Sequence, residues 1–347
     1  MEPLHNMTGE RLCEILKRIE NVRAAIFGDL CLDVYWHADM RMSELSRETP
    51  HFPMPVVEER ISPGGGANVA ANMAALKPGR VMAAGTAGRD WRGRELFRLM
   101  EESGVISEYI VREAGLVTNA FCKPLRKGIS AAVYEDPRLD FANTAPLGEA
   151  VEDALITALD ALAPQVDILC ISDQLPANVY GAVTERVRGH ILKLARNGLT
   201  VAADSRDRIG LYRDMILKPN EVEGARAAGM AAASGLRDYA EAASVLSRKQ
   251  ACAVIMTVGA NGSLYAADGT VTHIPAHPVT GEIDIVGAGD SFLSGFSLAL
   301  AAGASRLEAA FFAGLCSEVV IQKIGTTGTA SPEEILERYH QTRSDKP

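Results

Sequence analysis

The stretch that decides how this chain folds is Asp284-Ile285-Val286-Gly287-Ala288-Gly289-Asp290, which runs directly into the apolar segment Ser291-Phe292-Leu293-Ser294-Gly295-Phe296. The small residues before Asp290 allow the backbone N–H groups of Gly287, Ala288 and Gly289 to converge at the start of a helix. Unpaired amides and the helix dipole together favour a bound anion there. A carboxylate beside an anion needs a task, and Asp290 can take the proton of an attacking hydroxyl. The stretch therefore indicates phosphoryl transfer, with an anion hole at 287–289 and Asp290 as the general base.

Two other interpretations of this stretch involve no phosphoryl transfer. A Gly-x-Gly turn can open a dinucleotide-binding helix, but residues 287–292 lack the third glycine of that fingerprint and do not follow the first strand. A glycine-rich turn can also use Asp290 simply as a helix N-cap. The rest of the chain decides between these interpretations.

The composition is that of a globular chain with a large core. Its 347 residues are 47% hydrophobic and 23% charged, and the formal net charge is −9. This acidic balance argues against a general nucleic-acid binder and against a binder of anionic membranes. No apolar run reaches the ~20 residues that span a bilayer, and no signal peptide is recognisable. The six cysteines are scattered without metal-ligand spacing, so a reducing, cytoplasmic location is expected.

Short apolar runs alternate with amphipathic stretches along the chain. Strands are predicted at 23–28, 80–85, 107–112, 166–172, 199–204, 214–218 and 252–258. Helices are predicted at 67–76, 91–103, 148–161, 177–196, 236–249, 288–302 and 305–323, and the Ala-rich segment 225–235 is expected to be a small-residue helix. This alternation predicts an α/β fold with a mostly parallel central sheet, helices on both faces, and ligands at the carboxyl ends of the strands.

Two segments interrupt the alternation. Residues 31–62 contain Pro50, Pro53 and Pro55 among alternating Val, Glu and Arg residues, and residues 116–142 resemble short strands with polar flanks. Both segments are expected to form a small β lid outside the main sheet. The chain is otherwise expected to be one domain over 1–347.

A second glycine-rich segment offers polar groups to a small ligand. Asp33 follows a predicted strand, where it can accept hydrogen bonds from paired sugar hydroxyls, although a capped turn would also explain it. In Gly64-Gly65-Gly66-Ala67-Asn68 the glycines allow a ligand to approach the backbone, and the Asn68 amide can both donate and accept. These groups suit a polyhydroxylated ligand.

Together these motifs resemble those of the ribokinase (PfkB) family of sugar kinases. The segments 64–68 and 287–290 carry the resemblance, in this order and at this spacing. Three further elements agree: Gly88-Arg89-Asp90-Trp91-Arg92-Gly93 with the family's Gly-x-Asp-x-x-Gly turn, Asn220-Glu221-Val222-Glu223 with its Asn-x-x-Glu element, and Thr257-Val258-Gly259-Ala260-Asn261-Gly262 with its Thr-x-Gly-x-x-Gly element. The resemblance covers nearly the whole chain and implies a single ribokinase-like kinase domain.

Within the family, the chain resembles the kinases that phosphorylate D-glycero-D-manno-heptose 7-phosphate. The supporting segments are 32–36, 55–57, 138–141 and 323–326. Val34 departs from this pattern, because heptose kinases often carry a basic residue there. Ile285 stands where the family usually has a small hydroxyl residue or proline. This departure argues against a monovalent-cation site without ruling one out. The nucleotidyltransferase domain that is often fused behind that kinase is not expected in this chain.

The resemblance implies ATP and Mg²⁺, and transfer of the γ-phosphoryl group to a sugar hydroxyl. Asp33, Gly65, Gly66 and Asn68 are then expected to bind the sugar. Asn220, Thr257, Gly259 and Gly262 are expected to border the nucleotide, and Glu223 to hold Mg²⁺ with Asn220, through water. If the sugar already carries a phosphate, the lid cations Arg47, Lys123, Arg126, Lys127 and Arg138 are candidates to meet it. Glu223 can instead be a solvated helix-start carboxylate, and Asp204 either a cap or a neighbour of the site.

Other acceptors, and a protein without catalysis, are the alternatives. Fructose or 2-keto-3-deoxygluconate would suit the same motifs, whereas a nucleoside would need an aromatic platform, for which Phe52 and Phe121 offer little. A sugar or nucleotide sensor of the same fold has no need of a base such as Asp290 beside a phosphate. The partners expected are the sugar and a second copy of the chain, paired through the lid because exposed strand edges favour pairing. No nucleic acid or membrane partner is expected.

Overall fold

A nine-stranded sheet forms the body of the molecule in the computed structural model, which describes residues 7–130, 132–176 and 179–344. The strand order is β14-β13-β12-β11-β10-β9-β1-β4-β5. The parallel strands are β1 (Arg23–Gly28), β4 (Arg80–Gly88), β5 (Ile106–Glu113), β9 (Ile168–Asp173), β10 (Val201–Ser205), β11 (Ile216–Leu217) and β12 (Val254–Thr257). The antiparallel strands β13 (Ser263–Ala267) and β14 (Thr270–Ile274) extend one edge. Because the other strands run the same way, their carboxyl ends meet at one edge of the sheet.

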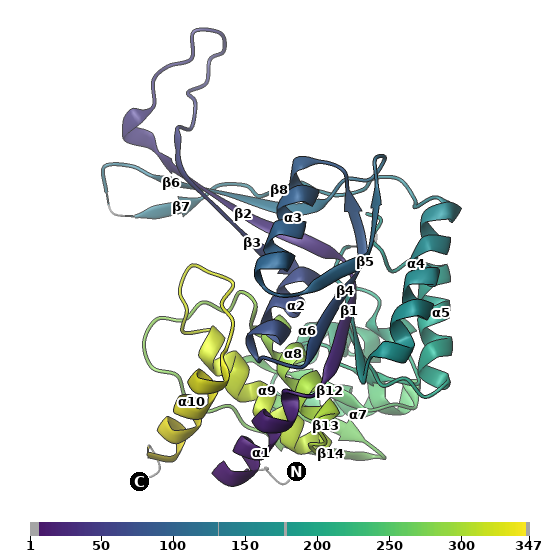
Figure 1. The fold of residues 1–347 in the computed structure, drawn as a ribbon. Helices are drawn as coiled ribbons and strands as arrows, with labels where there is room; N and C mark the ends of the chain where they lie inside the picture. The colour runs from purple at the N-terminus through teal and green to yellow at the C-terminus, as the bar shows by residue number, and fades with distance from the viewer. Residues whose placement is uncertain (1–6, 131, 177–178, 345–347) are drawn as a thin grey trace.

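Helices cover both faces of this sheet (Figure 1). One face carries α1 (Gly9–Ile19), α2 (Gly66–Ala75), α3 (Trp91–Glu102), α8 (Ala288–Ala301), α9 (Arg306–Val320) and α10 (Pro332–Ser344). The other carries α4 (Glu149–Leu162), α5 (Glu185–Arg196), α6 (Glu221–Ala228) and α7 (Leu236–Gln250). Successive residues of β1 serve the two cores in turn: Ile26 packs into the first and Phe27 into the second, both with no exposed surface. A strand buried on both faces explains why its sequence is continuously apolar.

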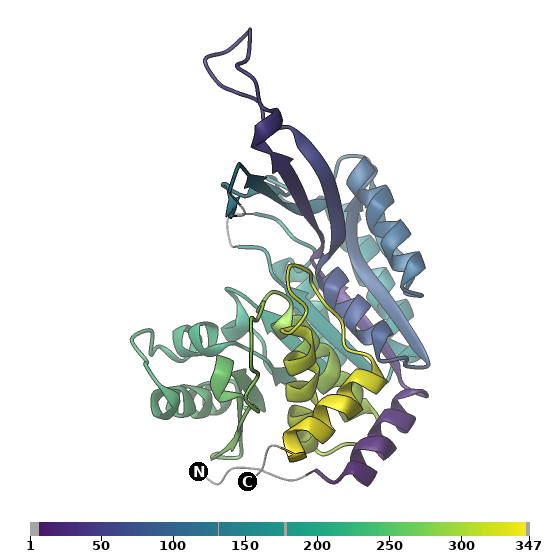
Figure 2. The same ribbon diagram turned by 90° about the vertical axis from the view of Figure 1, so that its left-hand side faces the viewer.

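A smaller five-stranded sheet projects from the body, as Figures 1 and 2 show. It consists of β2 (Leu30–Asp39), β3 (Val56–Gly65), β6 (Asn119–Lys127), β7 (Val133–Glu135) and β8 (Leu139–Phe141). We call this sheet the lid. Only Asp29 separates β1 of the body from β2 of the lid, and β3 returns directly into α2 at Gly65–Gly66. The lid is therefore attached at the carboxyl edge of the main sheet.

The predicted fold class is confirmed. Each predicted strand overlaps a strand of the main sheet. The predicted lid segments 31–62 and 116–142 overlap all five strands of the small sheet, although β2 begins one residue earlier and β3 continues to Gly65. The sequence patterns did not indicate α1, α10 or the β13–β14 hairpin. Short 3₁₀ turns complete the backbone: η1 (Met40–Met42), η2 (Ala163–Gln165), η3 (Ile209–Leu211) and η4 (Gly259–Asn261).

Two predicted helices have the wrong limits. The helix expected at 177–196 begins only at Glu185, and residues 177–178 lie outside the described part of the chain. Residues 179–184 are not helical, because the amide of Ala182 bonds to Asp29 and the Thr184 hydroxyl caps α5. The helix expected at 225–235 ends at Ala228, where Gly229 adopts a left-handed φ of 85° and caps α6.

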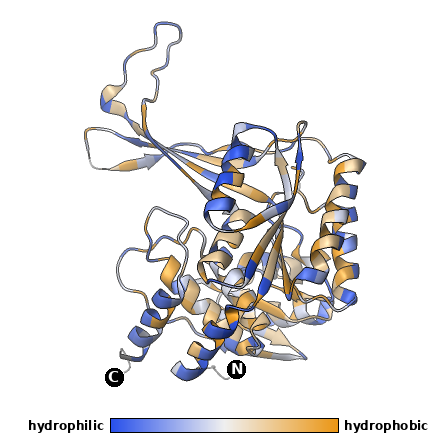
Figure 3. Cartoon of the chain, viewed as in Figure 1, coloured by the Kyte–Doolittle hydropathy of each residue, from blue (hydrophilic) through white to orange (hydrophobic). Residues whose placement is uncertain are grey.

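Apolar residues are concentrated where the layers meet (Figure 3). The strands of the main sheet are largely apolar in this view, whereas α1 and α10 carry many polar residues. Among residues 7–130, 132–176 and 179–344, no helix has both the length and the apolar character needed to cross a membrane.

Candidate active site

The structure brings together the two glycine-rich segments that the sequence analysis singled out. Asn68 lies in the first turn of α2 and Asp290 in the first turn of α8, and the Asn68 Nδ2 donates to Asp290 Oδ2 at 2.7 Å. The amide of Asn68 is oriented by Asn72, whose Nδ2 donates to Asn68 Oδ1 at 3.1 Å. Because Asn68 Oδ1 accepts this bond from Asn72, the NH₂ group of Asn68 points toward the Asp290 carboxylate.

The Asp290 carboxylate titrates near neutral pH. Burial raises its pKa to about 7, the bond from Asn68 opposes that rise, and the nearby charge of Asp204 adds to it. Lys218 lowers the pKa and Asp33 raises it. A carboxylate with such a pKa is deprotonated in part at neutral pH and basic enough to accept a proton from a hydroxyl. Asp290 is therefore suited to general-base chemistry.

The start of α8 offers backbone amides beside Asp290. Gly287 is the N-cap, with a left-handed φ of 83° that favours glycine. The Ala288 N–H donates to the Ile285 carbonyl at 3.2 Å, so an anion would compete with this turn. Within the described residues, the N–H groups of Gly289 and Asp290 have no hydrogen-bond acceptor. These free amides at a helix N-terminus face the region expected to receive an anion.

Asp33 lies on β2 and is 7% exposed. A Cβ on Gly64 would stand 2.9 Å from Asp33 Oδ2, so the glycine leaves room for this carboxylate. The Lys123 Nζ of β6 lies 3.3 Å from Asp33 Oδ1 and donates to the Tyr35 hydroxyl at 2.9 Å. Burial raises the pKa of Asp33 although Lys123 pulls it down. The sequence analysis placed both residues at the sugar without predicting their contact.

More cations surround Asp33 on the lid. The Arg60 guanidinium lies 4.3 Å from the centre of the Tyr35 ring, and its Nε is buried with no hydrogen-bond partner among the described residues. Arg138 stacks 4.7 Å from the centre of Phe121 and pairs with Asp140. Both positive charges lower the pKa of Asp33. Arg60 was not among the lid cations predicted from the sequence, although it lies only four residues before Gly64, where the glycine-rich segment begins.

Asn220 and Glu223 form a capping box at the start of α6. Asn220 Oδ1 accepts from the Glu223 N–H at 2.8 Å, and Glu223 Oε2 accepts from the Asn220 N–H at 2.9 Å. The structural interpretation of Glu223 as a helix-start carboxylate is thus present in the fold. Burial and the charge of Asp204 also raise the pKa of Glu223 to about 7, which an ordinary solvated cap would not show. The second oxygen, Oε1, is free of this box and could face a cation.

A buried ion pair, Lys218 with Asp204, lies near both Asp290 and Glu223. Lys218 Nζ is 2.8 Å from Asp204 Oδ2, with side chains only 3% and 8% exposed. The same Nζ is 3.7 Å from where a Cβ on Gly289 would stand. Burial opposes the charge of Lys218, but Asp204, Glu223 and Asp290 keep its pKa raised. Sequence reasoning assigned no task to Lys218, and its place directly before Pro219 and Asn220 was the available signal.

Thr257, Gly259 and Gly262 follow the end of β12. Thr257 forms a bridge with Asn220, and its N–H donates to the Pro219 carbonyl at 3.0 Å. Gly262 has a φ of 89°, and a Cβ there would lie 2.2 Å from the Ile274 carbonyl, so its glycine has a structural cause. Apart from its two chain neighbours, no described residue has an atom within 4 Å of a Cβ placed on Gly259, which leaves open space for a ligand.

The residues present fit a nucleotide with Mg²⁺. Among the described residues, no three His, Cys, Asp or Glu side chains gather into a metal site. This is compatible with Mg²⁺ that is held chiefly by phosphate oxygens and water with one carboxylate, and Glu223 is the carboxylate that the sequence analysis expected in that place. Asp284 is engaged otherwise: its carboxylate accepts the N–H groups of Val286 and Gly325, both at 3.0 Å. A cavity of about 950 Å³ between α4 and α5 contains none of the predicted site residues.

The comparisons with known proteins agree with this geometry. A model of the pfkB family carbohydrate kinases matches residues 32–334. The bifunctional protein HldE of Citrifermentans bemidjiense is 32% identical over 92% of this chain, and that of Hyphomonas neptunium is 31% identical over 94%. The chain spans 64% and 65% of the lengths of these two relatives.

Solved structures share the fold at low sequence identity. Phosphofructokinase-2 from Escherichia coli in complex with potassium superposes with a TM-score of 0.72 at 21% identity, over 93% of this chain and 99% of the other. Ribokinase from Arabidopsis thaliana, complexed with ribose and ATP, gives a TM-score of 0.69 at 18% identity, over 92% and 98%. With the family match over most of the sequence, the conclusion is direct: this chain belongs to the pfkB family of carbohydrate kinases.

Proposed function

We propose that this protein transfers the γ-phosphoryl group of ATP to a hydroxyl of a phosphorylated sugar, with Asp290 as the general base. The observation that carries the proposal is the 2.7 Å bond between Asn68 and Asp290. It joins the glycine-rich segment expected to bind the sugar to the helix start expected to bind the transferred phosphoryl group. A base between an acceptor and an anion site is the arrangement that phosphoryl transfer requires.

Each part of the site then has a task. Asp33, the Gly65–Gly66 backbone and Asn68 hold the sugar so that its hydroxyl meets Asp290. The amides at the start of α8, with that of Gly289 free and that of Ala288 released from the Ile285 carbonyl, stabilise charge on the transferred group. One such donor is typically worth ~3–4 kcal/mol. Mg²⁺, when bound, neutralises the phosphate oxygens, and Glu223 with Asn220 would hold it.

Lys218 gives this site its buried positive charge. Its Nζ lies beside the Gly289 backbone while it pairs with Asp204. We therefore place it against the phosphate chain. Thr257, Gly259 and Gly262 border the nucleotide on the other side of Asn220.

The substrate class follows from the cations around Asp33. A neutral sugar needs hydroxyl partners, whereas this end of the site holds Lys123, Arg60 and Arg138 within range of a single buried carboxylate. The unpartnered Nε of Arg60 can donate to a phosphate oxygen of the acceptor. These residues favour a sugar phosphate. The resemblance of segments 32–36, 55–57, 138–141 and 323–326 to heptose 7-phosphate kinases makes a heptose 7-phosphate the best candidate. Fructose and 2-keto-3-deoxygluconate, which carry no phosphate, are less suited to this end.

The test is coupled ADP release with Mg-ATP against matched pairs of phosphorylated and unphosphorylated sugars, heptose 7-phosphate included. We expect turnover with a sugar phosphate only, and loss of turnover in Asp290→Asn. In Arg60→Met the KM for the sugar phosphate should rise, while Arg41→Met, an exposed lid cation that pairs with Asp39 at the end of β2, serves as the matched control. A preference for the unphosphorylated partner would refute the substrate class. Binding without turnover for every sugar would favour the sensor instead.

We further propose that two copies pair through the lid. The lid exposes several large apolar side chains, among them Val57, Val133, Tyr134 and Leu139. Exposed apolar side chains and open strand edges on a projecting sheet are suited to a matching sheet of a second copy. Light scattering should give twice the chain mass for the wild type and a monomer for Val57→Lys; a monomeric wild type at micromolar concentration would refute the pairing.

A further inference from the structure

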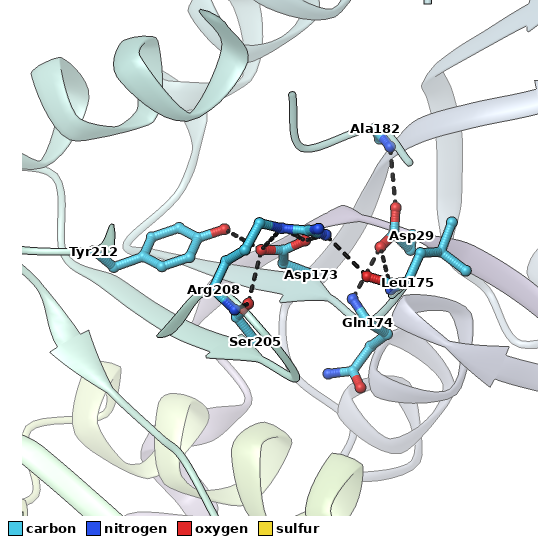
Figure 4. Close-up of polar contacts among 8 residues, drawn as sticks. All are labelled: Asp29, Asp173, Gln174, Leu175, Ala182, Ser205, Arg208 and Tyr212. Atoms are coloured by element: carbon cyan, nitrogen blue, oxygen red, sulfur yellow. Dashed lines mark hydrogen bonds and ion pairs between the residues drawn. The ribbon is translucent and has the colours of Figure 1, made fainter. Parts of the chain in front are cut away.

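Asp29 is the one residue between β1 of the main sheet and β2 of the lid. Its side chain is almost fully buried, at 1% exposure, and it accepts three backbone amides. Oδ2 accepts from the N–H of Gln174 at 2.9 Å and of Leu175 at 3.0 Å, and Oδ1 accepts from that of Ala182 at 3.0 Å (Figure 4). One carboxylate thus anchors both ends of the connection that follows β9.

The backbone of Asp29 is bonded as well. Its N–H donates to the Ser172 carbonyl of β9 at 2.9 Å, and its carbonyl accepts from the Gly66 N–H at 2.9 Å. Gly66 is the first residue of α2, the helix that carries Asn68. Asp29 therefore links β9, residues 174, 175 and 182, and the glycine-rich segment at one point, directly before the strand that carries Asp33.

Arg208 provides a second anchor, which holds the carbonyl group of Leu175. Arg208 donates to the Leu175 carbonyl at 2.9 Å while its Nε lies 3.1 Å from the buried carboxylate of Asp173 (Figure 4). The Tyr212 hydroxyl, at 2.9 Å, and the Ser205 hydroxyl, at 2.7 Å, complete the bonds to Asp173. Leu175 is thus held through both its N–H and its carbonyl group.

The contact with Asp29 leaves no room for adjustment. A Cβ on Gly181 would stand 2.0 Å from Asp29 Oδ1, so only glycine allows the chain to approach the carboxylate this closely. Buried amides that lose such an acceptor cost free energy, and those bonded to a charged group cost more. Residues 174, 175 and 182 are consequently held in one arrangement around Asp29, four residues before Asp33 in the chain.

We propose that Asp29 is a positioning residue for sugar binding. It holds residues 174–175 and 182 and the N–H of Gly66 in fixed relation to Asp33, so that the sugar meets a preformed surface. It touches neither the nucleotide nor the transferred group. This inference rests on the proposed sugar kinase activity, and it assigns Asp29 an effect on the acceptor alone.

The test compares three substitutions that disturb this anchor from different sides. Asp29→Asn turns one acceptor oxygen into a donor that faces an N–H group, Gly181→Ala crowds the carboxylate, and Arg208→Met frees the Leu175 carbonyl. The matched control is Asp167→Asn, since that carboxylate also accepts a backbone amide, from Arg23 at 2.8 Å, but at the amino end of the same two strands.

In all three variants we expect the KM for the sugar phosphate to rise roughly tenfold, about 1.4 kcal/mol, with kcat and the KM for ATP little changed. Asp29→Asn and Gly181→Ala together should cost less than the sum of their separate effects. If Asp29 had only a structural role, the variants would lose thermal stability, but the KM for the sugar phosphate would not rise selectively over kcat. The control variant is expected to behave in that way. Unaltered sugar KM in variants that still turn over would overturn the inference.

A readout independent of turnover accompanies the kinetics. The amides of Gln174, Leu175 and Ala182 should exchange hydrogen slowly in the wild type and at least tenfold faster in Asp29→Asn. Unchanged exchange would overturn the anchor itself. A wild-type protein that phosphorylates no sugar while its three amides respond to Asp29→Asn would contradict the proposed function rather than the anchor.

Discussion

Replacing Asn68 by Ala tests the central contact of the site through the pH dependence of the reaction. The bond from Asn68 lowers the pKa of Asp290 against the larger effect of burial, which holds it at about 7. Asp290 must be deprotonated to act as a base, so activity falls as pH drops through its pKa. Without the bond the pKa rises, and the acid limb of kcat/KM must move to higher pH.

The size of this shift follows from the strength of one hydrogen bond to a charged group. Such a bond contributes ~1.5–3 kcal/mol, and one pKa unit corresponds to about 1.4 kcal/mol. At the lower end of this range the limb should move by about one unit. Because Asn68 is also proposed to contact the sugar, the overall rate will fall at every pH as well.

The assay is the pH profile of kcat/KM for the acceptor, measured from pH 5 to 9. Glu223 also has a pKa near 7, so its contribution must be separated from that of Asp290. Glu223→Gln removes that group and should leave the acid limb of Asp290 in place. An acid limb that stays at its wild-type position in Asn68→Ala, or that disappears in Glu223→Gln, would refute the assignment of Asp290 as the titrating base.

Three further substitutions follow from the structure. Lys218→Met should lower kcat by at least 100-fold and reduce the melting temperature, because it leaves the buried carboxylate of Asp204 unpaired at a cost of ~3–5 kcal/mol; retained activity would remove Lys218 from the site. Gly262→Ala should destabilise the fold by at least ~1 kcal/mol, as its φ of 89° and the carbonyl 2.2 Å away exclude a Cβ; an unchanged urea midpoint would contradict this. Glu318→Ala should destabilise the protein by ~3–5 kcal/mol, since Arg338, 2.9 Å away, would remain buried without its carboxylate. The melting temperature should therefore fall while the kinase activity at low temperature stays unchanged, and an unchanged melting temperature would contradict this.

The main sheet could be predicted because its strands are buried on both faces. Runs such as residues 23–28 and 168–173 are apolar without interruption, and the helices between them have a clear apolar face. The hairpin β13–β14 was missed although the sequence carries its signal, since Asp268-Gly269 is a typical hairpin turn and Asp268 adopts a φ of 50°. The lid was located from its break in helical periodicity, although its strand pairing could not be read from that break.

The candidate site was predictable where a motif places several groups in a row. Asn68 and Asp290 are 222 residues apart, and their contact follows from two separate helix starts at the same sheet edge. Lys218, Arg60 and Asp29 were missed as functional residues, because their tasks depend on what surrounds them. Periodicity does not reveal that Asp29 meets three amides from a distant connection.

The attachment of the lid determines how it can move. Gly28 cannot carry a Cβ, which would lie 2.1 Å from the Ser172 carbonyl, and Asp29 is bonded on every side, so the root of the lid is clamped rather than hinged. β2 nevertheless extends for 10 residues, a lever arm of about 33 Å. A tilt of only about 10° along such an arm displaces its free end by roughly 6 Å. The lid therefore behaves as a cantilever, in which a gradual twist of the strands produces large travel at the tip while the sugar-facing base stays still.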